Sequence, residues 1–291
     1  MKAVAVLGPG GVGGLVAAAL ARAGTPVPVV AREETAEGLD RDGIRVRSVR
    51  LGEFHAEVRA VARIDEPVDL LVVATKATGL EAALDRVAGT PGLVVPLLNG
   101  IDHLALLRER WPHVVCAGVI RVESDRPEPG VIVQTSPFLR IDLAPDSAAT
   151  RAAAHVLRAA EIPTAVGESE AEVMWGKLVR LNALACTTAA FPATIGEIRN
   201  HPHRRLALEG AVDEGAAVAR AEGAAMAADE VLAEIGDIHA ESTSSMARDV
   251  AAGREPELDA IPGAVLRAAA RHGIPTPTIE ELVERIRQRL A

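Results

Sequence analysis

The residues with the most evident chemistry are glycines near the start of the chain. Gly8, Gly10 and Gly13 follow a short apolar run and precede an alanine-rich stretch of helical character. In this strand–turn–helix setting the spacing predicts a phosphate-binding turn: the first glycine permits the turn, the second lets an anion approach the backbone, and the third lets helix and strand pack closely. The amides of Gly11 and Val12 would face the anion at the helix start.

The same region has one competing interpretation. Lys2, the apolar run and the segment 19–21 are superficially similar to a secretory signal. Five glycines and a proline between positions 8 and 14 interrupt any continuous apolar stretch. The interruption favours the nucleotide-binding turn.

Arg32 follows the second predicted strand, at the position that contacts the adenosine ribose in dinucleotide folds. A guanidinium there can pair with the 2′-phosphate of NADP through two hydrogen bonds, whereas an acid would favour NAD. Arg32 therefore predicts NADPH. Glu33 and Glu34 come next, so NAD binding and a plain surface ion pair stay open as alternatives.

Two further polar residues follow later strands of the same predicted sheet. Lys76 comes after the apolar run 69–74, and Asn99 comes after the run 92–98. Ligands bind at the carboxyl ends of strands in such sheets, so both residues are candidates for cofactor contact. A solvated loop lysine and an ordinary Asn-Gly turn are the alternatives.

Lys177 is the candidate proton donor. It lies in a helical stretch between apolar neighbours, and Leu181 shares its helix face. Desolvation would make the ammonium group a better proton donor and would direct a positive charge at a developing alkoxide. A surface lysine whose stem covers apolar side chains is an equally good interpretation of the spacing alone.

A polar segment near the C-terminus could contact a ligand. Ser245 and Asp249 are one helical turn apart, and the carboxylates of Glu255, Glu257 and Asp259 follow. Helix capping and acids placed near turns explain much of this pattern without a ligand.

The elements that must position these residues change character along the chain. Strands and helices alternate as far as residue 168, and helical patterns dominate from there onward. We therefore expect an α/β protein: a Rossmann-type dinucleotide-binding domain with a mainly parallel sheet at 1–168, and an all-α substrate domain at 169–291, with a cleft between them. The expected strands are 2–7, 26–31, 44–47, 57–62, 69–74, 92–98, 114–122, 131–134, 138–143 and 164–166, with a Pro-rich turn at 126–130. The expected helices are 12–23, 80–88, 102–110, 147–160, 169–190, 203–222, 243–252, 263–272 and 279–290.

Composition limits the partners of the protein. A net charge of −9 does not suit nucleic acid or an anionic membrane as the main partner, so a small-molecule substrate is expected. No uninterrupted apolar stretch is long enough to span a bilayer and a secretory signal is disfavoured, so a cytoplasmic location is expected. Cys116 and Cys186 are isolated in sequence, which indicates neither a disulfide framework nor a metal site and suggests two small buried residues. The alanine-rich helices are compatible with a homodimer or a monomer.

Taken together, these segments resemble the ketopantoate reductase (2-dehydropantoate 2-reductase) family over nearly the whole chain. The glycine turn, Arg32, Lys76 and Asn99 match its cofactor-binding half, and Trp175-Gly-Lys177 is similar to its W-x-K motif. The strongest match is a C-terminal series: Ser244-Ser245-Met246, Asp249, Gly253-Arg254, Glu257-Leu258-Asp259, Pro262-Gly263 and Arg271-His272-Gly273-Ile274-Pro275.

The resemblance implies an NADPH-dependent enzyme that reduces a small 2-oxo acid to the 2-hydroxy acid, with ketopantoate as the first candidate substrate. It implies that Lys177 acts as general acid and that Asn99 lies near both cofactor and substrate. Ser245 and Glu257 would hold the substrate, with the Glu257 carboxylate accepting from a substrate hydroxyl. No metal is implied.

Departures from the family pattern concern the substrate more than the reaction. Leu181 and Ala185 stand four and eight residues after Lys177, where members often have asparagine. Asn182 is one place late and should point about 100° away around the helix. Two further departures are Pro262, in place of a frequent asparagine, and Leu98, in place of the usual glutamine.

Two rival functions stay open at this point. One is a reductase of the same architecture that acts on a different ketone or an imine, which the missing asparagines suggest. The other is a sensor that binds NADP(H) without turnover.

Overall fold

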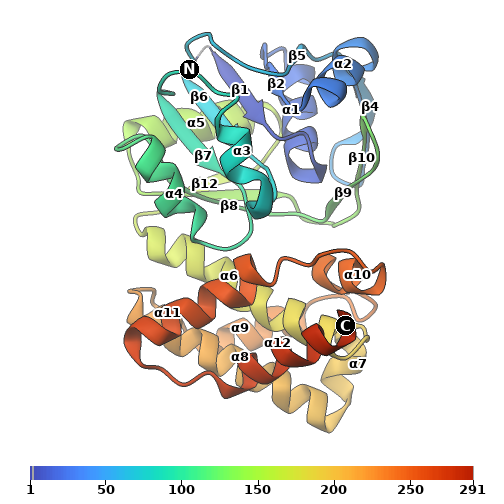
Figure 1. Cartoon of the computed structure of the whole chain (residues 1–291), viewed down its shortest axis with the longest axis vertical. Coiled ribbons are helices and arrows are strands. Elements are labelled where there is room, and N and C mark those ends of the chain that lie inside the picture. The colour runs from blue at the N-terminus through green and yellow to red at the C-terminus, as the bar shows by residue number, and fades with distance from the viewer. Residues whose placement is uncertain (2, 291) are drawn as a thin grey trace. The chain divides into compact units, whose positions relative to one another are not determined.

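The computed structural model describes residues 1 and 3–290, so Lys2, the first residue of the first predicted strand, lies outside the described residues, as does Ala291. The chain forms two compact units (Figure 1). The α/β unit comprises Met1–Asn99 and His103–Val173, and the helical unit comprises Gly100–Asp102 and Met174–Ala291. In the described part of the chain, no helix is both long enough and apolar enough to cross a membrane.

A parallel sheet forms the centre of the α/β unit. Its strand order is β5 (Ala60–Val61), β2 (Val29–Val30), β1 (Val4–Leu7), β6 (Leu70–Val73) and β7 (Leu93–Pro96), and every neighbouring pair is parallel. The apolar runs in the sequence become strands because both faces of this sheet are covered. The predicted α/β fold with a mainly parallel sheet is therefore confirmed.

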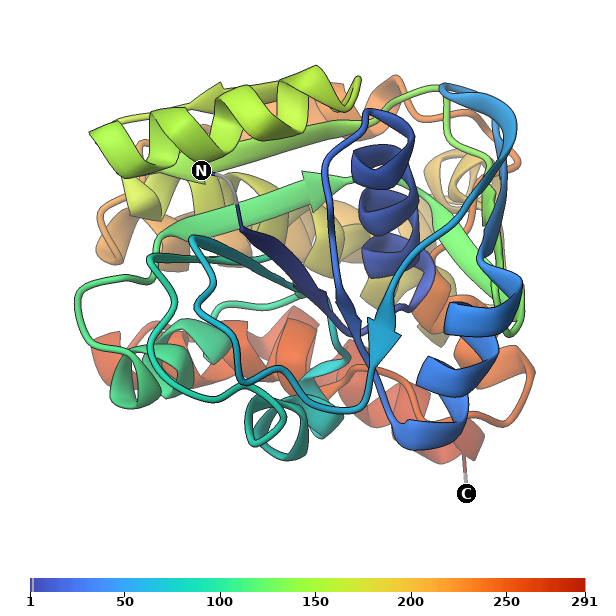
Figure 2. The same cartoon turned by 90° about the horizontal axis from the view of Figure 1, so that it is seen from above.

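Side chains of β1 alternate between two cores. Val4 and Val6 pack with residues of α1 (Gly11–Arg22) and α5 (Ala148–Ala159). Ala5 and Leu7 pack with residues of α3 (Leu80–Leu84) and α4 (His103–Arg110). Figure 2 shows α5 and the α3–α4 pair on opposite sides of the strands. The sheet is thus held between two helical layers, with its strand ends in a fixed register.

Two smaller sheets complete the α/β unit. One has the order β4 (Gly52–Ala56), β3 (Ile44–Ser48), β10 (Val131–Gln134) and β9 (Ser124–Glu128), and it packs on α1. The other has the order β12 (Thr164–Val166), β11 (Arg140–Ala144) and β8 (Ala117–Arg121). Both sheets mix parallel and antiparallel pairs, whereas the central sheet is parallel throughout.

The predicted Pro-rich turn at 126–130 is wrong for its first half. Residues Arg126 to Glu128 belong to β9, and the turn itself comprises Pro129 and Gly130, whose φ is 73°. Pro127 is tolerated because β9 lies at the edge of its sheet, where a missing N–H breaks no ladder on the open side.

Other elements were not predicted or are shorter than expected. The helix α2 (Glu33–Asp42) was missed because it buries only Ala36 and Leu39, which gives too weak an apolar pattern. The strand β4 was also missed, and β2 and β5 are each shorter than the predicted runs 26–31 and 57–62.

The helical unit is built around α6 (Glu170–Ala190), most of whose length is buried. A second long helix, α8 (Pro202–Ala221), contacts α7, α9, α11 and α12. The expected helices at 169–190, 203–222, 243–252, 263–272 and 279–290 are confirmed, whereas α7 and α9 were missed. Their bounds are α7 Ile195–Asn200, α9 Ala228–Gly236, α10 Ser245–Ala251, α11 Ala264–His272 and α12 Pro277–Leu290.

A π-helical turn, η2 (Asp259–Gly263), immediately precedes α11. In an α-helix the carbonyl of Leu258 would accept from the amide of residue 262, but Pro262 has no N–H. The Gly263 amide takes that position and donates to Leu258 O at 2.9 Å, which makes the turn one residue wider. Such π turns are frequent at functional sites.

Candidate functional site

Four of the sequence-predicted residues follow strands at one edge of the central sheet. The last residues of β2, β1, β6 and β7 pair with one another in a single register row. The predicted residues come one to three positions beyond this row: they are Gly8, Arg32, Lys76 and Asn99. Strand register alone therefore brings these four positions to the carboxyl edge, where doubly wound sheets bind ligands.

The glycine turn has the geometry its spacing predicts. Gly8 has a φ of 93°, which favours glycine, and the Gly10 amide donates to Gly8 O at 2.9 Å. A Cβ on Gly13 would clash with the carbonyl oxygen of Gly8, so this glycine is needed for α1 to approach the turn. A Cβ on Gly11 would clash with the backbone of Ser124, whose hydroxyl donates to Gly11 O at 2.8 Å.

Gly10 differs from its neighbours. Its φ of −75° and ψ of −167° suit any residue, and the nearest atom to an added Cβ is Ala74 O at 4.0 Å. Nothing among the described residues therefore requires glycine at this position. The first turn of α1 carries no acidic side chain, and amides of a first helical turn lack intrahelical acceptors. This arrangement suits a bound anion that approaches the backbone at Gly10.

Arg32 is exposed and lies at the N-cap of α2. The surface pair that the sequence left open does not form: Glu33 instead accepts from Arg86 at 3.2 Å, and within the described residues no ion pair joins Arg32 to Glu33 or Glu34. A backbone hydrogen bond and Arg86 hold the pKa of Glu33 below its usual value. The Arg32 guanidinium is thus available to a ligand.

One side chain beside the glycine turn was missed at the sequence level. Thr75 packs its methyl group against Gly8, 2.7 Å from where a Cβ would lie. Its Oγ1 is buried and makes no hydrogen bond to any described residue. A threonine after an apolar strand is too common in sequence to attract notice, and only the structure shows its position.

In the helical unit, Lys177 lies on the half-buried side of α6. Leu181 and Leu184 are also partly exposed on this side, whereas Trp175 and Leu178 are buried at 3% and 2% exposure. Lys177 therefore shares its side of α6 with two leucines.

Asn182 has a different environment from Lys177. Its side chain is fully buried, its Oδ1 accepts from the Cys186 thiol at 3.3 Å, and its Nδ2 has no hydrogen-bond partner among the described residues. A side chain directed into the core does not replace the family asparagines. Ala185, at the second of those positions, is also fully buried.

The two serines at the start of α10, Ser244 and Ser245, have different environments. Ser244 is buried and caps the helix: its Oγ accepts from the Ala247 amide at 3.0 Å and is 2.8 Å from Thr188 Oγ1. Ser245 is exposed at the first position of the helix, where its hydroxyl can meet a ligand. Asp249 accepts from Arg254 at 2.8 Å and so has a structural role.

Glu257 is partly exposed and lies two residues before the first residue of the π turn. Its backbone carbonyl accepts from the Ile261 amide at 3.0 Å, which fixes the peptide at this position. The helical unit therefore supplies an amine, a hydroxyl and a carboxylate.

Comparisons with known proteins assign both regions of the chain to one family. The model of the family "Ketopantoate reductase PanE/ApbA" matches residues 4–145, and that of its C-terminal region matches residues 171–290. The chain belongs to the ketopantoate reductase family. It is accordingly an oxidoreductase that acts on CH–OH groups.

Relatives of this reductase align with nearly its whole length. A 2-dehydropantoate 2-reductase of Caulobacter vibrioides is 31% identical over 291 residues, with 95% of each chain covered. A ketopantoate reductase structure from Ralstonia eutropha has a TM-score of 0.88 at 26% identity, covering 99% of this chain and 98% of that one. The structure of a D-mandelate dehydrogenase with NADH and anilino(oxo)acetate shares the fold, with a TM-score of 0.89 at 21% identity and the same coverage.

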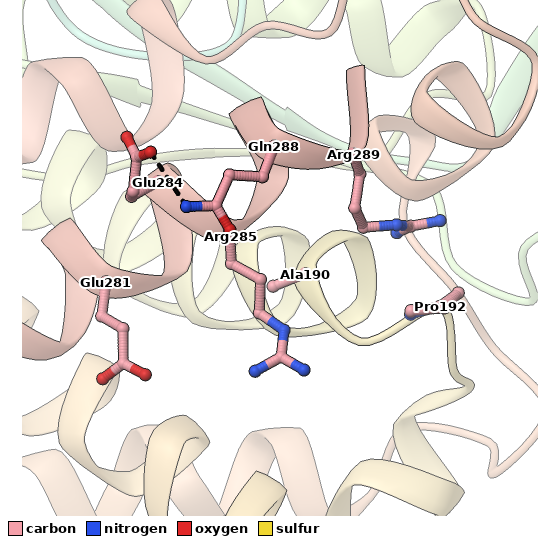
Figure 3. A pocket seen from close by; sticks show the side chains of 7 residues that line it. All are labelled: Ala190, Pro192, Glu281, Glu284, Arg285, Gln288 and Arg289. Atoms are coloured by element: carbon pink, nitrogen blue, oxygen red, sulfur yellow. Dashed lines mark hydrogen bonds between the residues drawn. The ribbon is translucent and has the colours of Figure 1, made fainter. Parts of the chain in front are cut away.

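A surface pocket of about 570 Å³ lies away from the predicted residues of the reductase, at the C-terminal end of α6 and along α12 (Figure 3). Two glutamates and two arginines line it and balance in charge, and Gln288 donates to Glu284 at 3.1 Å. It therefore favours neither an anion nor a cation. Its lining residues are Ala190, Pro192, Glu281, Glu284, Arg285, Gln288 and Arg289.

Both cysteines of the reductase are buried, at 3% exposure for Cys116 and 0% for Cys186, which confirms that prediction. Burial raises the pKa of each thiol to about 12. At pH 8 both thiols are then protonated and shielded, so a thiol reagent such as DTNB should label neither in the native protein. After unfolding in guanidinium the same assay should count two thiols; labelling of the native protein would contradict the packing described here.

Proposed function

We propose that this reductase transfers hydride from NADPH to the ketone of a small 2-oxo acid and yields the 2-hydroxy acid, with 2-dehydropantoate as the first candidate substrate. The observation that carries the proposal is the register row at the carboxyl edge of the central sheet, which presents the glycine turn and an exposed Arg32 together. Residues 1–168 would bind the cofactor, and residues 169–291 would supply the groups that act on the substrate.

In this proposal NADPH would supply the hydride, and residues of the chain would bind the cofactor, hold the substrate and supply the proton. Gly8, Gly10, Gly11, Val12 and Gly13 would receive the pyrophosphate. Arg32 would pair with the 2′-phosphate, and Lys76 and Asn99 would contact the cofactor nearer its reactive end.

The substrate would be held by hydrogen-bond donors and an acceptor that complement its own polar groups. Asn99 and Ser245 would donate to it, and Glu257 would accept from a hydroxyl. Lys177 would donate a proton from Nζ to the ketone oxygen as the hydride reaches the carbon, so that no free alkoxide is formed. A second carboxylate on the substrate would be repelled by Glu257, which favours monocarboxylic 2-oxo acids.

A second candidate substrate class rests on Leu181. This side chain is partly exposed on the Lys177 side of α6, at a position where family members often have asparagine. An apolar side chain there favours a 2-oxo acid with an apolar substituent over one with a hydroxyl.

The decisive experiment follows NADPH absorbance with 2-dehydropantoate and a panel of 2-oxo acids with apolar, hydroxylated and dicarboxylic side chains. Oxidation with 2-dehydropantoate as the best substrate supports the first proposal, and a preference for apolar 2-oxo acids supports the second. Turnover only with other ketones or imines would indicate the broader reductase. Tight NADPH binding without turnover of any substrate would indicate a sensor.

Replacing Arg32 by alanine tests the choice of cofactor. Losing a charge-assisted hydrogen bond costs about 1.5–3 kcal/mol, so the Kd for NADPH should rise roughly 10- to 150-fold. The Kd for NADH should change little, because NADH has no 2′-phosphate. Isothermal titration with each cofactor measures both values.

Arg41→Ala is the matched control for this test. Arg41 lies on the same helix and pairs with Asp42 at the surface. Its loss should leave NADPH binding unchanged. Equal weakening of NADPH and NADH by Arg32→Ala would refute the proposed contact with the 2′-phosphate.

A further inference from the structure

The segment that follows Asn99 is fixed to the segment that follows Glu257. Gly100–Asp102 groups with the helical unit although its neighbours on both sides belong to the α/β unit. Gly100 has a φ of 81°, and a Cβ there would clash with the carbonyl oxygen of Ala260 in η2. These two backbones therefore touch, and only glycine permits the approach.

One guanidinium joins the two segments. Arg267, on α11, donates from Nε and NH2 to Asp102 Oδ2 at 3.1 and 2.5 Å. Its NH1 donates to Asp259 Oδ1 at 2.6 Å, and its NH2 donates to the Asp259 carbonyl at 2.8 Å. All three nitrogens of the guanidinium are used, which a lysine ammonium could not reproduce with the same geometry.

The two segments joined by Arg267 each adjoin a proposed substrate contact. Asn99 immediately precedes Gly100, and Glu257 is two residues before Asp259. A single half-exposed ion pair contributes little to stability, but a guanidinium with two acidic partners restricts both backbones. Small displacements of groups that orient a substrate have large effects on turnover.

We infer that Arg267 is a positioning residue, which with Asp102 and Asp259 holds residues 100–102, the segment after Asn99, against η2, the turn that follows Glu257. This inference rests on the proposed function for its consequence in catalysis. Its structural content, the joining of residues 100–102 to η2, is independent of the substrate.

The test uses Arg267→Ala, Asp102→Ala and the double variant in the full-length protein. Each single variant should lower kcat/KM for the best 2-oxo acid about tenfold, mainly through a higher KM. The double variant should lose no more than either single variant, because both remove the same contact. The Kd for NADPH should be unchanged, and Arg267→Lys should recover part of the activity, since a positive charge is kept.

Arg271→Ala is the control from the same helix. It breaks the 3.0 Å ion pair with Glu222 and so perturbs α11 without touching residues 100–102. Its kcat/KM should stay near that of the wild type. If Arg271→Ala and Arg267→Ala lower kcat/KM and thermal stability alike, Arg267 is merely structural and the inference is overturned.

Hydrogen–deuterium exchange separates this inference from the proposed function. Arg267→Ala should speed exchange in peptides that cover 97–103 and 257–263, whether or not a substrate is known. Unchanged exchange there overturns the inference even if 2-oxo acid reduction is established. A wild-type protein inactive with every 2-oxo acid refutes the proposed function, while faster exchange in the variant still supports the joining of the two segments. Faster exchange with unchanged kcat/KM overturns the positioning role.

Discussion

Replacing Lys177 by alanine is expected to lower kcat for the best 2-oxo acid by about 10²- to 10⁴-fold, the usual contribution of a general acid. The Kd for NADPH should be unchanged, because the glycine turn and Arg32 belong to the α/β unit and Lys177 to the helical unit. Steady-state kinetics and a fluorescence titration of NADPH give the two quantities separately. The separation of chemistry from cofactor binding is what the assigned role requires.

Arg180→Ala provides the control for Lys177. It removes the same charge from the same helix, where Arg180 is 3.7 Å from Glu234 across an ion pair. It should retain most of the wild-type kcat. Equal losses of turnover and NADPH affinity in Lys177→Ala, or equal losses of turnover in the two variants, would refute Lys177 as the proton donor.

The sequence predicted those parts of the fold in which one strong local signal suffices. Buried strands such as β1 and β6 are continuous apolar runs, and their burial on both faces follows from the alternation of strands and helices. The helix α2 gives no such signal, because only two of its side chains are buried. The strand β9 is charged and contains Pro127, and it forms only because β10 offers an edge to pair with.

Some residues of the candidate site could likewise be predicted from the sequence, and others could not. Residues that follow strands could be assigned to the carboxyl edge from sequence, because register determines where they lie. Thr75 could not be distinguished from an ordinary threonine, since its burial and the lack of a hydrogen bond to its Oγ1 among the described residues are seen only in the structure. The role of Arg267 depends on two acids, one of which is 165 residues away in the chain, and a contact of that range leaves no local pattern.

Substitutions in the glycine turn should change the melting temperature and the Kd for NADPH independently of each other. Gly10→Ala places a methyl group in space that the protein leaves open, so the melting temperature should hold. If that space receives the pyrophosphate, the overpacking cost of about 1–3 kcal/mol should raise the Kd for NADPH roughly 5- to 150-fold. Gly13→Ala forces its methyl group against the carbonyl of Gly8 and should instead lower the melting temperature, with cofactor binding lost as a consequence.

Gly38→Ala completes the comparison. Gly38 lies within α2 with no atom near an added Cβ, so alanine should stabilise the protein by about 0.5–1 kcal/mol and leave NADPH binding unchanged. Differential scanning fluorimetry with and without NADPH measures all three variants. Because Gly10 is not required by the fold, a Gly10→Ala variant that binds NADPH as well as the wild type would show that no anion approaches the backbone there. The proposed cofactor site, and the reductase mechanism built on it, would then be wrong.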